Sequence, residues 1–385
     1  MRAFASGYYA NLRALYDHLG IRYHAQPFLF DLATSATATA NDTRDTSYFI
    51  YASNLHQLAP RPASVGRWRH VGEVAYLIFS YVWFLLCCLL VQPQPGETLH
   101  EYLHRTRIPC HFVTSYLLPL MSSVTTCPHA TLLAFPATDI VEYKRRTLSS
   151  PHLRVSDGVR QVQDRLVKDI PFQLNATVTA VEPCGEGVRI SWAQCSDSVR
   201  NTHADYFDKV ILAVTPDVVG RIFQPLRHHM SQIPTTIVES FVHTDTRVMG
   251  RTDAQRVKAP GTQLIHIHTS TESEQKTESH HLQPCGAIVT TCPFSPIDPA
   301  HILHSSRFTR VLRSPDSQKM VNAVFRTNPD LCHDKSTPLW KNGDENVWLV
   351  GGWCWDGMVL LEGCVVSAMR VAHALDVEIP WRSQM

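Results

Sequence analysis

The sequence predicts a mixed α/β fold of one or two domains, and three patterns support this prediction. Residues 347–350 form a short apolar run that two glycines end, and apolar residues then recur at helical spacing up to Leu375. Residues 209–214 form a second buried-strand pattern, after a helix pattern at 156–166 and strand patterns at 172–181 and 188–192. Further strand patterns around residues 48, 242, 266 and 288 predict an additional sheet.

Length and composition are those of a folded globular protein. The chain has 385 residues, of which 44% are hydrophobic and 18% charged, so it can bury a large core. A net charge of +1 offers no basic footprint for nucleic acid, and we exclude that class of partner. The eleven cysteines are odd in number and show no C-x-x-C spacing, which favours reduced thiols and an intracellular location, cytoplasmic or membrane-associated.

The glycines that follow the strand at 347–350 have two interpretations. Gly357 and Gly363 lie just before and just inside the predicted helix, where a missing side chain lets a ligand approach the positive end of the helix dipole. The simpler interpretation is that many α/β proteins end a strand in Gly-Gly and begin a helix after it.

The residues of this segment resemble a known motif. V-W-x-x-G-x-W from Val347, followed by D-G-x-x-x-x-E-G-x-x-x-S-A from Asp356, is similar to the C-terminal flavin motif of the flavin-containing amine oxidoreductase superfamily. The resemblance implies a two-domain FAD-dependent amine oxidase-like fold, in which the helix start lies beneath the isoalloxazine ring. The positions that match the motif are Gly352, Trp353, Gly357, Leu361, Glu362 and Gly363. Ser367-Ala368 departs from the usual Ser-Gly.

A second segment resembles another part of the same flavin domain. The helix, hairpin and buried strand between residues 156 and 214 are similar to its third section, which ends in Asp208-Lys-Val-Ile-Leu-Ala-Val-Thr-Pro216. Val178 falls where the family pairs a strand backbone with the adenine of FAD. Because a backbone contact tolerates any β-forming residue, Val178 alone is a weak signal.

The segment that grips the dinucleotide in this superfamily is missing from the chain. None of the 17 glycines builds a G-x-G-x-x-G loop, and Gly185-Glu-Gly187 is predicted to be a hairpin turn. An amphipathic helix begins near the first residue instead, with Asn11 as its expected N-cap and Gly20 as its stop. The resemblance therefore implies an incomplete Rossmann-type FAD domain, a truncated relative, and FAD that is weakly bound or absent.

The resemblance also implies how the chain is divided. Residues 1–134 and 235–335 are expected to form the substrate domain, while 135–230 and 340–380 form the flavin-domain segments. A short polar-faced helix is expected at 98–107. Residues 251–261 and 271–284 are polar and are expected to be exposed loops.

Val74 to Val91 is an apolar run of 18 residues without a charge, and it admits three interpretations. It reaches the length of a membrane-span candidate, and Arg67, Arg69 and His70 flank its start. It is also compatible with a helix that lies on a membrane surface, or with a helix buried in a large core.

Three groups of histidines were considered as chemical sites. His243 and Asp245 are spaced to share one strand face, where they orient each other or hold a strand corner. His266 and His268 also share a face, but a metal site needs a third ligand and none stands at useful spacing, so no metal is expected. His129, a lone histidine after proline, is read as structural.

Two function classes remain. The first is an FAD-dependent oxidoreductase of the amine oxidase type, which oxidises a small organic substrate by hydride transfer to flavin. No side chain in the sequence can be named as its catalytic base. The alternative is a non-catalytic or truncated relative that does not bind flavin stably. An upstream reading frame that encodes a strand and a G-x-G-x-x-G loop would favour the enzyme.

Overall fold

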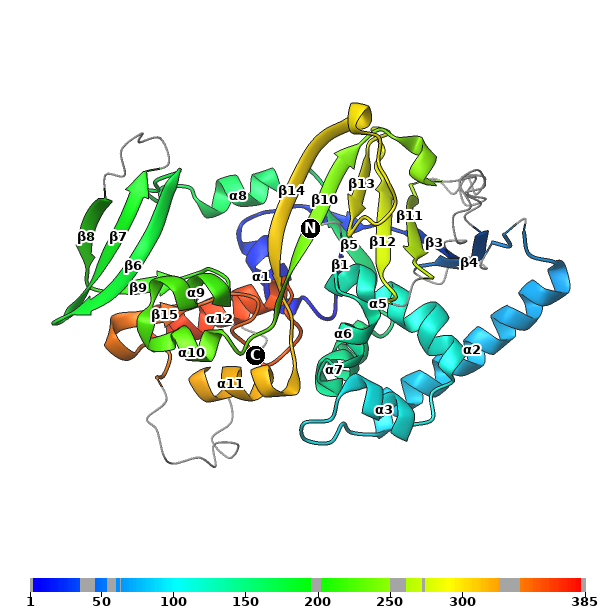
Figure 1. The fold of residues 1–385 in the computed structure, drawn as a ribbon, viewed down its shortest axis with the longest axis horizontal. Coiled ribbons are helices and arrows are strands. Elements are labelled where there is room, and N and C mark those ends of the chain that lie inside the picture. Colours follow the sequence, from blue (N-terminus) through cyan, green and yellow to red (C-terminus); the bar gives the residue numbers. More distant parts are fainter. Residues whose placement is uncertain are drawn as a thin grey trace.

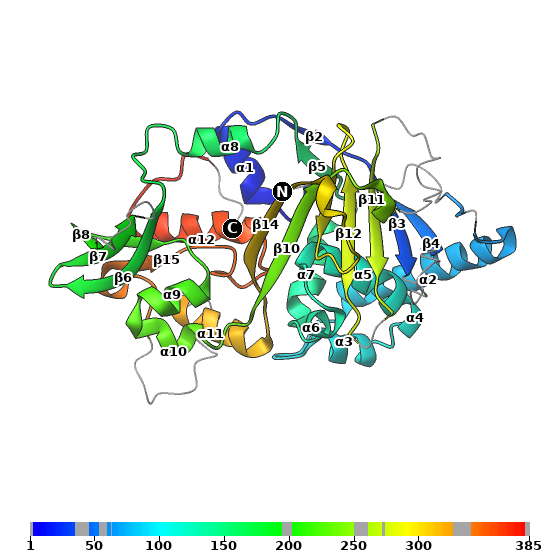
Figure 2. The same cartoon turned by 45° about the horizontal axis from the view of Figure 1, so that its top comes forward.

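The computed structural model describes residues 3–34, 46–53, 60–62, 64–194, 202–249, 261–271, 274–325 and 340–381. The elements gather at two ends of an elongated molecule (Figure 1). A seven-stranded sheet with most of the N-terminal helices lies at one end. The strand and helix expected near the C-terminus lie at the other end (Figures 1 and 2).

The seven-stranded sheet is mixed, in the order β14-β10-β13-β12-β11-β3-β4. The parallel pair is β11 with β3, and the other neighbours in this sheet are antiparallel. Its strands come from two separated parts of the sequence: β3 (Phe28–Thr34), β4 (Thr46–Ala52), β10 (Thr235–His243), β11 (Gln263–Thr269), β12 (Thr277–Leu282), β13 (Ile288–Thr291) and β14 (Ile302–Val311).

The strand β12 corrects the sequence prediction for residues 271–284. These residues were expected to form an exposed loop, but 277–282 form a strand whose residues up to His281 are buried. The polarity is misleading because the buried side chains bond to one another: His281 to Gln263 at 2.7 Å, and His280 to Thr290 at 2.8 Å. The other expected loop, 251–261, lies outside the described residues except for Gly261.

Most of the helices lie beside this sheet and share its core. The helix α5 packs on β11 and β12, and α2 and α3 both pack on α7. Val113–Leu117 form a π-helical turn between α4 and α5. The helices are α2 (Arg67–Leu90), α3 (Leu99–Arg105), α4 (Cys110–Phe112), α5 (Leu118–Thr125), α6 (His129–Leu133) and α7 (Ala137–Thr147). Thr98 caps α3 in a reciprocal capping box with Glu101, which accounts for the helix expected at 98–107.

At the opposite end, β15 (Val347–Leu349) pairs in parallel with β9 (Val210–Leu212). The two strands predicted to be neighbours from separated segments therefore lie side by side (Figure 1). The helix α12 (Leu361–Ala374) follows β15, as the apolar spacing predicts. Around them lie α8 (Arg160–Leu166), α9 (Pro216–Ile222), α10 (Arg227–Met230), α11 (Pro315–Phe325), and the sheet of β6 (Ala176–Cys184), β7 (Gly187–Gln194) and β8 (Thr202–Phe207). The assignment of whole domains to these boundaries stays a prediction.

The N-terminal segment packs between the two ends. A small antiparallel sheet contains β1 (Phe4–Ala5), β5 (His152–Val155) and β2 (Tyr23–Ala25), and α1 (Ala10–His18) contacts α12. Gly20 has a φ of +63° and ends α1 as expected. The predicted N-cap is wrong, because Asn11 lies inside the first turn and Tyr9 precedes the helix.

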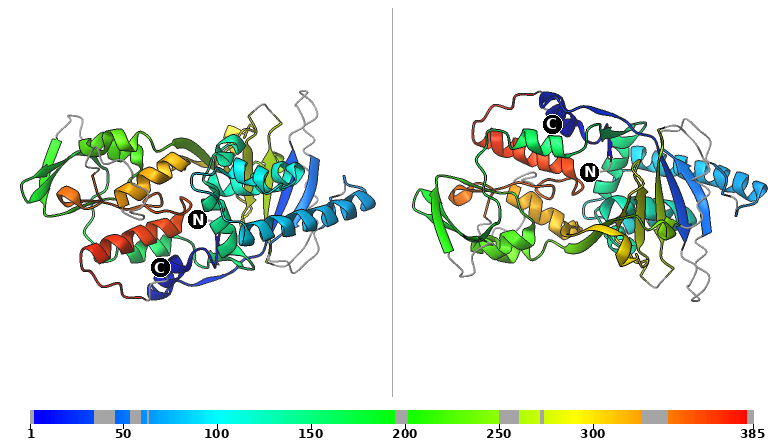
Figure 3. Two further views of the ribbon diagram at one scale, coloured as in Figure 1. Left: turned by 90° about the horizontal axis from the view of Figure 1, so that it is seen from below. Right: turned by 90° about the horizontal axis from the view of Figure 1, so that it is seen from above.

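The helix α2 projects from the body of the molecule (Figures 1 and 3). Among the described residues, α2 is the one helix that is both long enough and apolar enough to cross a membrane. Only 22% of its most apolar stretch is buried. Phe84, Cys87 and Cys88 face the protein, whereas Phe79 is 69% exposed and Leu90 is 76% exposed. The interpretation as a plain core helix therefore does not describe α2.

Candidate functional site

A cavity of about 400 Å³ lies beside the start of α12, where α1, α7 and the loop between β15 and α12 meet. Tyr8 and Asn11 form one wall, and α7 contributes Asp139 and Arg145. The floor includes Gly357, and the remaining lining residues are Gln92, Pro93, Thr138, Val141, Glu142, Arg146, Trp355, Asp356, Val366 and Arg370. Its volume lies in the range of small-molecule sites, and it adjoins the predicted flavin motif.

The indole of Trp355 covers the start of α12. A Cβ added to Gly363 would lie 2.4 Å from Nε1 of Trp355, and one added to Gly357 would lie 2.6 Å from its ring. Trp355 is buried, its Nε1 donates to the carbonyl of Met358 at 2.9 Å, and its ring packs edge-on against Tyr8. In this conformation the indole of Trp355 occupies the space over the two glycines, which is where the resemblance places the flavin.

Gly352 and Trp353 have packing roles of their own. A Cβ on Gly352 would lie 2.9 Å from the carbonyl oxygen of Leu360, so glycine lets the loop pass close to the helix start. Trp353 is buried, and its Nε1 donates to the carbonyl of Val214 at 3.0 Å, which fixes the loop to the end of β9. These two residues hold the turn, and neither lines the cavity.

Glu362 binds the start of α1. Its carboxylate accepts the backbone N–H groups of Asn11 and Leu12 at 2.9 and 3.0 Å, and the side-chain amide of Asn11 at 2.9 Å. Glu362 is 1% exposed. The carboxylate of Glu362 lies at the positive end of α1 and caps the helix, although Glu362 is 351 residues from Asn11 in the sequence. Tyr9, the residue before α1, does not cap it through its side chain.

We expect Glu362→Ala to lower the free energy of unfolding by about 3 kcal/mol or more, because it leaves buried N–H donors unpaired. Chemical denaturation of both proteins measures this difference. Glu182→Ala is the matched control, since Glu182 is half exposed and pairs with Arg189 only at the surface, at 3.6 Å; its expected cost is below about 1 kcal/mol. A loss at Glu362 no larger than at Glu182 would contradict the capping role.

Charged groups of both signs meet at the cavity. Asp139 is buried and lies 3.6 Å from Arg313, which is itself buried. Burial raises the pKa of Asp139 to about 7, although the nearby Arg313 guanidinium lowers it. A carboxyl group that titrates near neutral pH in a cavity is a candidate proton acceptor. Buried Nη2 of Arg145 and Nη1 of Arg370 have no hydrogen-bond partner in the described structure, so the cavity offers cationic donors as well.

The other predicted site residues lie outside the cavity. Val178 lies in β6 of a separate sheet and is 37% exposed, and Leu361 is likewise 37% exposed at the helix start. The structure thus places Gly357 and Gly363 against Trp355, Gly352 against Leu360, and Val178 apart from all of them. Their roles as flavin contacts stay predictions.

The histidines singled out in the sequence have structural partners. His243 receives the N–H of Asp245 at 3.2 Å on Nδ1, and its Nε2 lies 2.7 Å from Thr290 Oγ1. The Asp245 carboxylate binds Arg247 and the N–H of Asp298, so this pair holds a strand corner. His129 is buried, 2.8 Å from Thr277 Oγ1.

Comparison with known proteins addresses the fold. No family model and no curated protein matches the sequence. Among solved structures, cyclohexylamine oxidase from Brevibacterium oxydans IH-35A is 12% identical with a TM-score of 0.50, covering 97% of this chain and 87% of its own. A triple mutant of putrescine oxidase with redesigned cofactor binding gives the same values. The chain therefore has an amine oxidase-like fold.

A third similar structure shows that this fold is not tied to one reaction. The CLA-producing fatty acid isomerase from P. acnes is 10% identical with a TM-score of 0.55, covering 98% of this chain and 86% of its own. At such identities the amine oxidase-like fold is shared, while substrate and reaction are not transferred.

Sequence reasoning did not single out Trp355, Asp139 or Arg313. Trp355 lies within the segment that resembles the flavin motif, in the run Trp353-Cys354-Trp355. This run does not reveal which way the ring of Trp355 points. Asp139 and Arg313 are 174 residues apart, and no local pattern links them. A charged residue at an otherwise apolar helix face, such as Asp139 between Ala137 and Ile140, is the one signal that was present.

Proposed function

We propose that this chain is a flavin-dependent oxidoreductase of the amine oxidase type that acts on a small organic substrate and by itself holds FAD only weakly. The observation that carries the proposal is the parallel pair of β9 and β15 leading to the glycine-lined start of α12, beside a cavity, within an amine oxidase-like fold. Bound FAD would supply the hydride acceptor in such an enzyme.

The described arrangement does not fit FAD without rearrangement. The indole of Trp355 fills the space over Gly357 and Gly363, and the carboxylate of Glu362 is bonded to α1. We therefore derive no catalytic step through the flavin. The residues of the cavity that can act on a small molecule are the carboxyl group of Asp139 and the guanidinium groups of Arg145 and Arg370.

A second candidate follows from the same observation. If Trp355 keeps this position, the chain is a non-catalytic relative that does not bind flavin stably. The two candidates differ in whether the indole is a movable cover or a permanent filling of the site.

Replacing Trp355 tests whether the indole excludes FAD, and the FAD affinity of the parent chain then separates the two candidates. Displacing a buried indole costs on the order of 3 kcal/mol, so Trp355→Ala is expected to bind FAD about 100-fold more tightly than the parent chain. Quenching of FAD fluorescence measures the affinity, and circular dichroism verifies folding. Trp192→Ala is the control, because Trp192 lies on β7 and does not line the cavity. An unchanged FAD affinity in folded Trp355→Ala would show that the indole does not exclude FAD, whereas binding that is measurable in Trp355→Ala and undetectable in the parent chain would favour the non-catalytic relative.

The helix α2 carries a separate proposal, because it is apolar on both faces and the protein covers one of them. The covered face includes Ser80, Phe84, Cys87 and Cys88. The outward face carries Trp68, Val71, Ile78, Phe79, Val82, Leu86, Leu89 and Leu90. An apolar surface of this extent is typical of a contact with a partner or a membrane.

We propose that this outward face lies on a lipid membrane. Residues 74–90 contain no charge, and the exposed Arg67 and Arg69 at the helix start suit anionic headgroups. Exposed Trp68 and Trp83 have the side chain that is enriched at membrane interfaces. Because the opposite face packs on α4 and α7, a helix lying on the membrane keeps these contacts, whereas a helix crossing it would lose them.

A further inference from the structure

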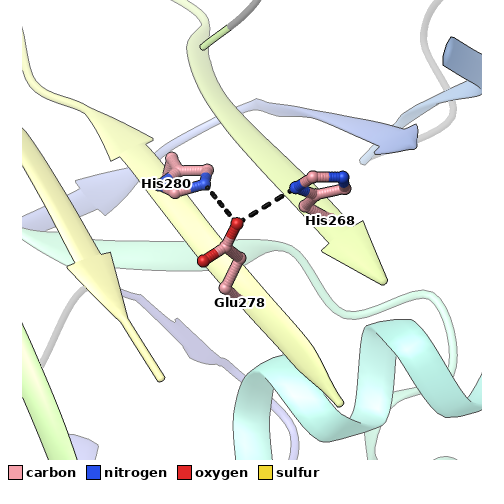
Figure 4. Close-up of side chains that lie close together, drawn as sticks. All are labelled: His268, Glu278 and His280. Carbon is pink, nitrogen blue, oxygen red and sulfur yellow. Dashed lines mark hydrogen bonds and ion pairs between the residues drawn. The ribbon is translucent and has the colours of Figure 1, made fainter. Parts of the chain in front are cut away.

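Two neighbouring strands of the large sheet bring three buried side chains together. His268 on β11 lies directly opposite Glu278 on β12, and His280 follows two residues later on the same face (Figure 4). The exposed fractions are 3%, 0% and 0%. The sequence offered His268 without a third ligand, because Glu278 and His280 lie in a segment that was expected to be a loop.

The separations of the polar atoms match those of ligands around one ion. Nδ1 of His268 lies 3.0 Å from Oε1 of Glu278, and Nε2 of His280 lies 3.3 Å from the same oxygen. The three ligand atoms all lie within 4.8 Å of one another. Zinc bonds of roughly 2.0–2.1 Å at tetrahedral angles place neighbouring ligand atoms about 3.3 Å apart. Small shifts of these side chains therefore suffice to surround an ion.

Neighbouring groups orient the side chains for this purpose. Nδ1 of His280 lies 2.8 Å from the hydroxyl oxygen of Thr290, which leaves Nε2 directed at Glu278. Oε2 of Glu278 accepts the N–H groups of Phe294 and Ser295 at 2.8 and 2.9 Å, while Oε1 faces the imidazoles and also accepts the hydroxyl of Ser295. Hydrogen bonds of this kind fix the tautomer and direction of metal ligands.

The residue types in the cluster also suit a cation. Glu278 supplies a carboxylate, His268 and His280 supply imidazole nitrogens, and all three side chains are buried. Buried charged groups in proteins are paired or coordinate metal ions.

We propose that His268, Glu278 and His280 bind a divalent transition-metal cation of the zinc type. Two imidazoles and one carboxylate form a common ligand set for zinc, and also for ferrous iron. Because all three side chains are buried, the ion would fasten β11 to β12 and stabilise the sheet, and the fourth position of a tetrahedral site would be left to water or another small ligand. This proposal is independent of the flavin, since none of the three residues lines the cavity beside α12.

Metal binding to the intact chain tests the proposal first. The purified protein is dialysed against a chelator and then titrated with Zn²⁺, Fe²⁺ and, as a spectroscopic probe, Co²⁺. We expect one equivalent of Zn²⁺ per chain, visible Co²⁺ absorption that Zn²⁺ abolishes, and a higher melting temperature with Zn²⁺ than with chelator. Less than a tenth of an equivalent, no Co²⁺ absorption and an unchanged melting temperature would show that protons and hydrogen bonds alone hold the cluster, which overturns the proposal.

Variants then locate the ion. Glu278→Gln and His280→Gln are expected to weaken Zn²⁺ binding by at least about 100-fold, and Thr290→Val by about 10-fold to 100-fold, because Thr290 positions a ligand. His281→Gln is the matched control: His281 is equally buried on β12 but bonds to Gln263. Equal Zn²⁺ binding by His281→Gln and Glu278→Gln, or retained binding in Thr290→Val and His280→Gln, would place the ion elsewhere. Should Glu278→Gln fail to fold, His280→Gln and Thr290→Val still locate the ion.

Discussion

The purified 385-residue chain is expected to be colourless, with an affinity for FAD about two to six orders of magnitude below that of a chain with a pyrophosphate-binding glycine loop. Each charge-assisted hydrogen bond to the pyrophosphate contributes roughly 1.5 to 3 kcal/mol. Losing two or three of them, at about 1.4 kcal/mol per tenfold, gives this factor. The position of Trp355 over Gly357 and Gly363 acts in the same direction.

The visible spectrum of the protein and a titration with FAD check this expectation. A yellow protein with stoichiometric flavin would contradict it, and would show that Trp355 moves and that other residues hold the pyrophosphate. Arg145 and Arg370, which line the cavity, would then be the first residues to replace. Fusing a segment with a strand and a G-x-G-x-x-G loop to the N-terminus is expected to strengthen FAD binding and give a yellow protein.

Removing the outward apolar face of α2 is expected to abolish membrane association. Ile78, Phe79 and Leu90 are each more than half exposed, and each contributes up to about 1.5 to 3 kcal/mol when it enters an apolar phase. Their joint replacement by serine is therefore expected to lower the partition into vesicles by at least about 100-fold. Cosedimentation with vesicles that contain anionic lipid measures the partition.

The same assay accommodates a control variant, and it distinguishes a helix that lies on the membrane from one that crosses it. Leu303→Ser removes an apolar side chain that is 64% exposed on β14, and is expected to leave the partition unchanged. If the helix lies on the membrane surface, high salt weakens its binding, because salt screens the attraction of Arg67 and Arg69 to anionic headgroups. A membrane-spanning helix needs detergent for release. A parent chain that stays wholly in the supernatant without detergent would contradict membrane contact in either form.

The elements that the sequence predicted well are those defined by neighbours in the chain. The strand at 347–349 and the helix from Leu361 follow from apolar spacing and glycines. The cap of α3 also lies within four residues, as Thr98 and Glu101. Where the partner is distant, prediction failed: Asn11 is not an N-cap, because Glu362 supplies the acceptor for the start of α1.

Polar strands were the second source of error. Thr277 to Leu282 looked like a loop because its composition is polar, yet the strand is buried. Such a strand is stable only if its side chains find partners, and these partners lie on β11, on β13 and in the segment after β13. No pattern within the segment reveals them.

The sequence by itself determined the mixed α/β class, the strand, glycine turn and helix near the C-terminus, and the apolar character of α2, because each depends on residues a few positions apart. Only the tertiary structure decided that Trp355 covers the helix start, that α2 turns one apolar face outward, and that His268 meets Glu278 and His280. The physical reason is that burial and polar pairing depend on which surfaces meet. In this chain those surfaces come from strands and helices tens to hundreds of residues apart.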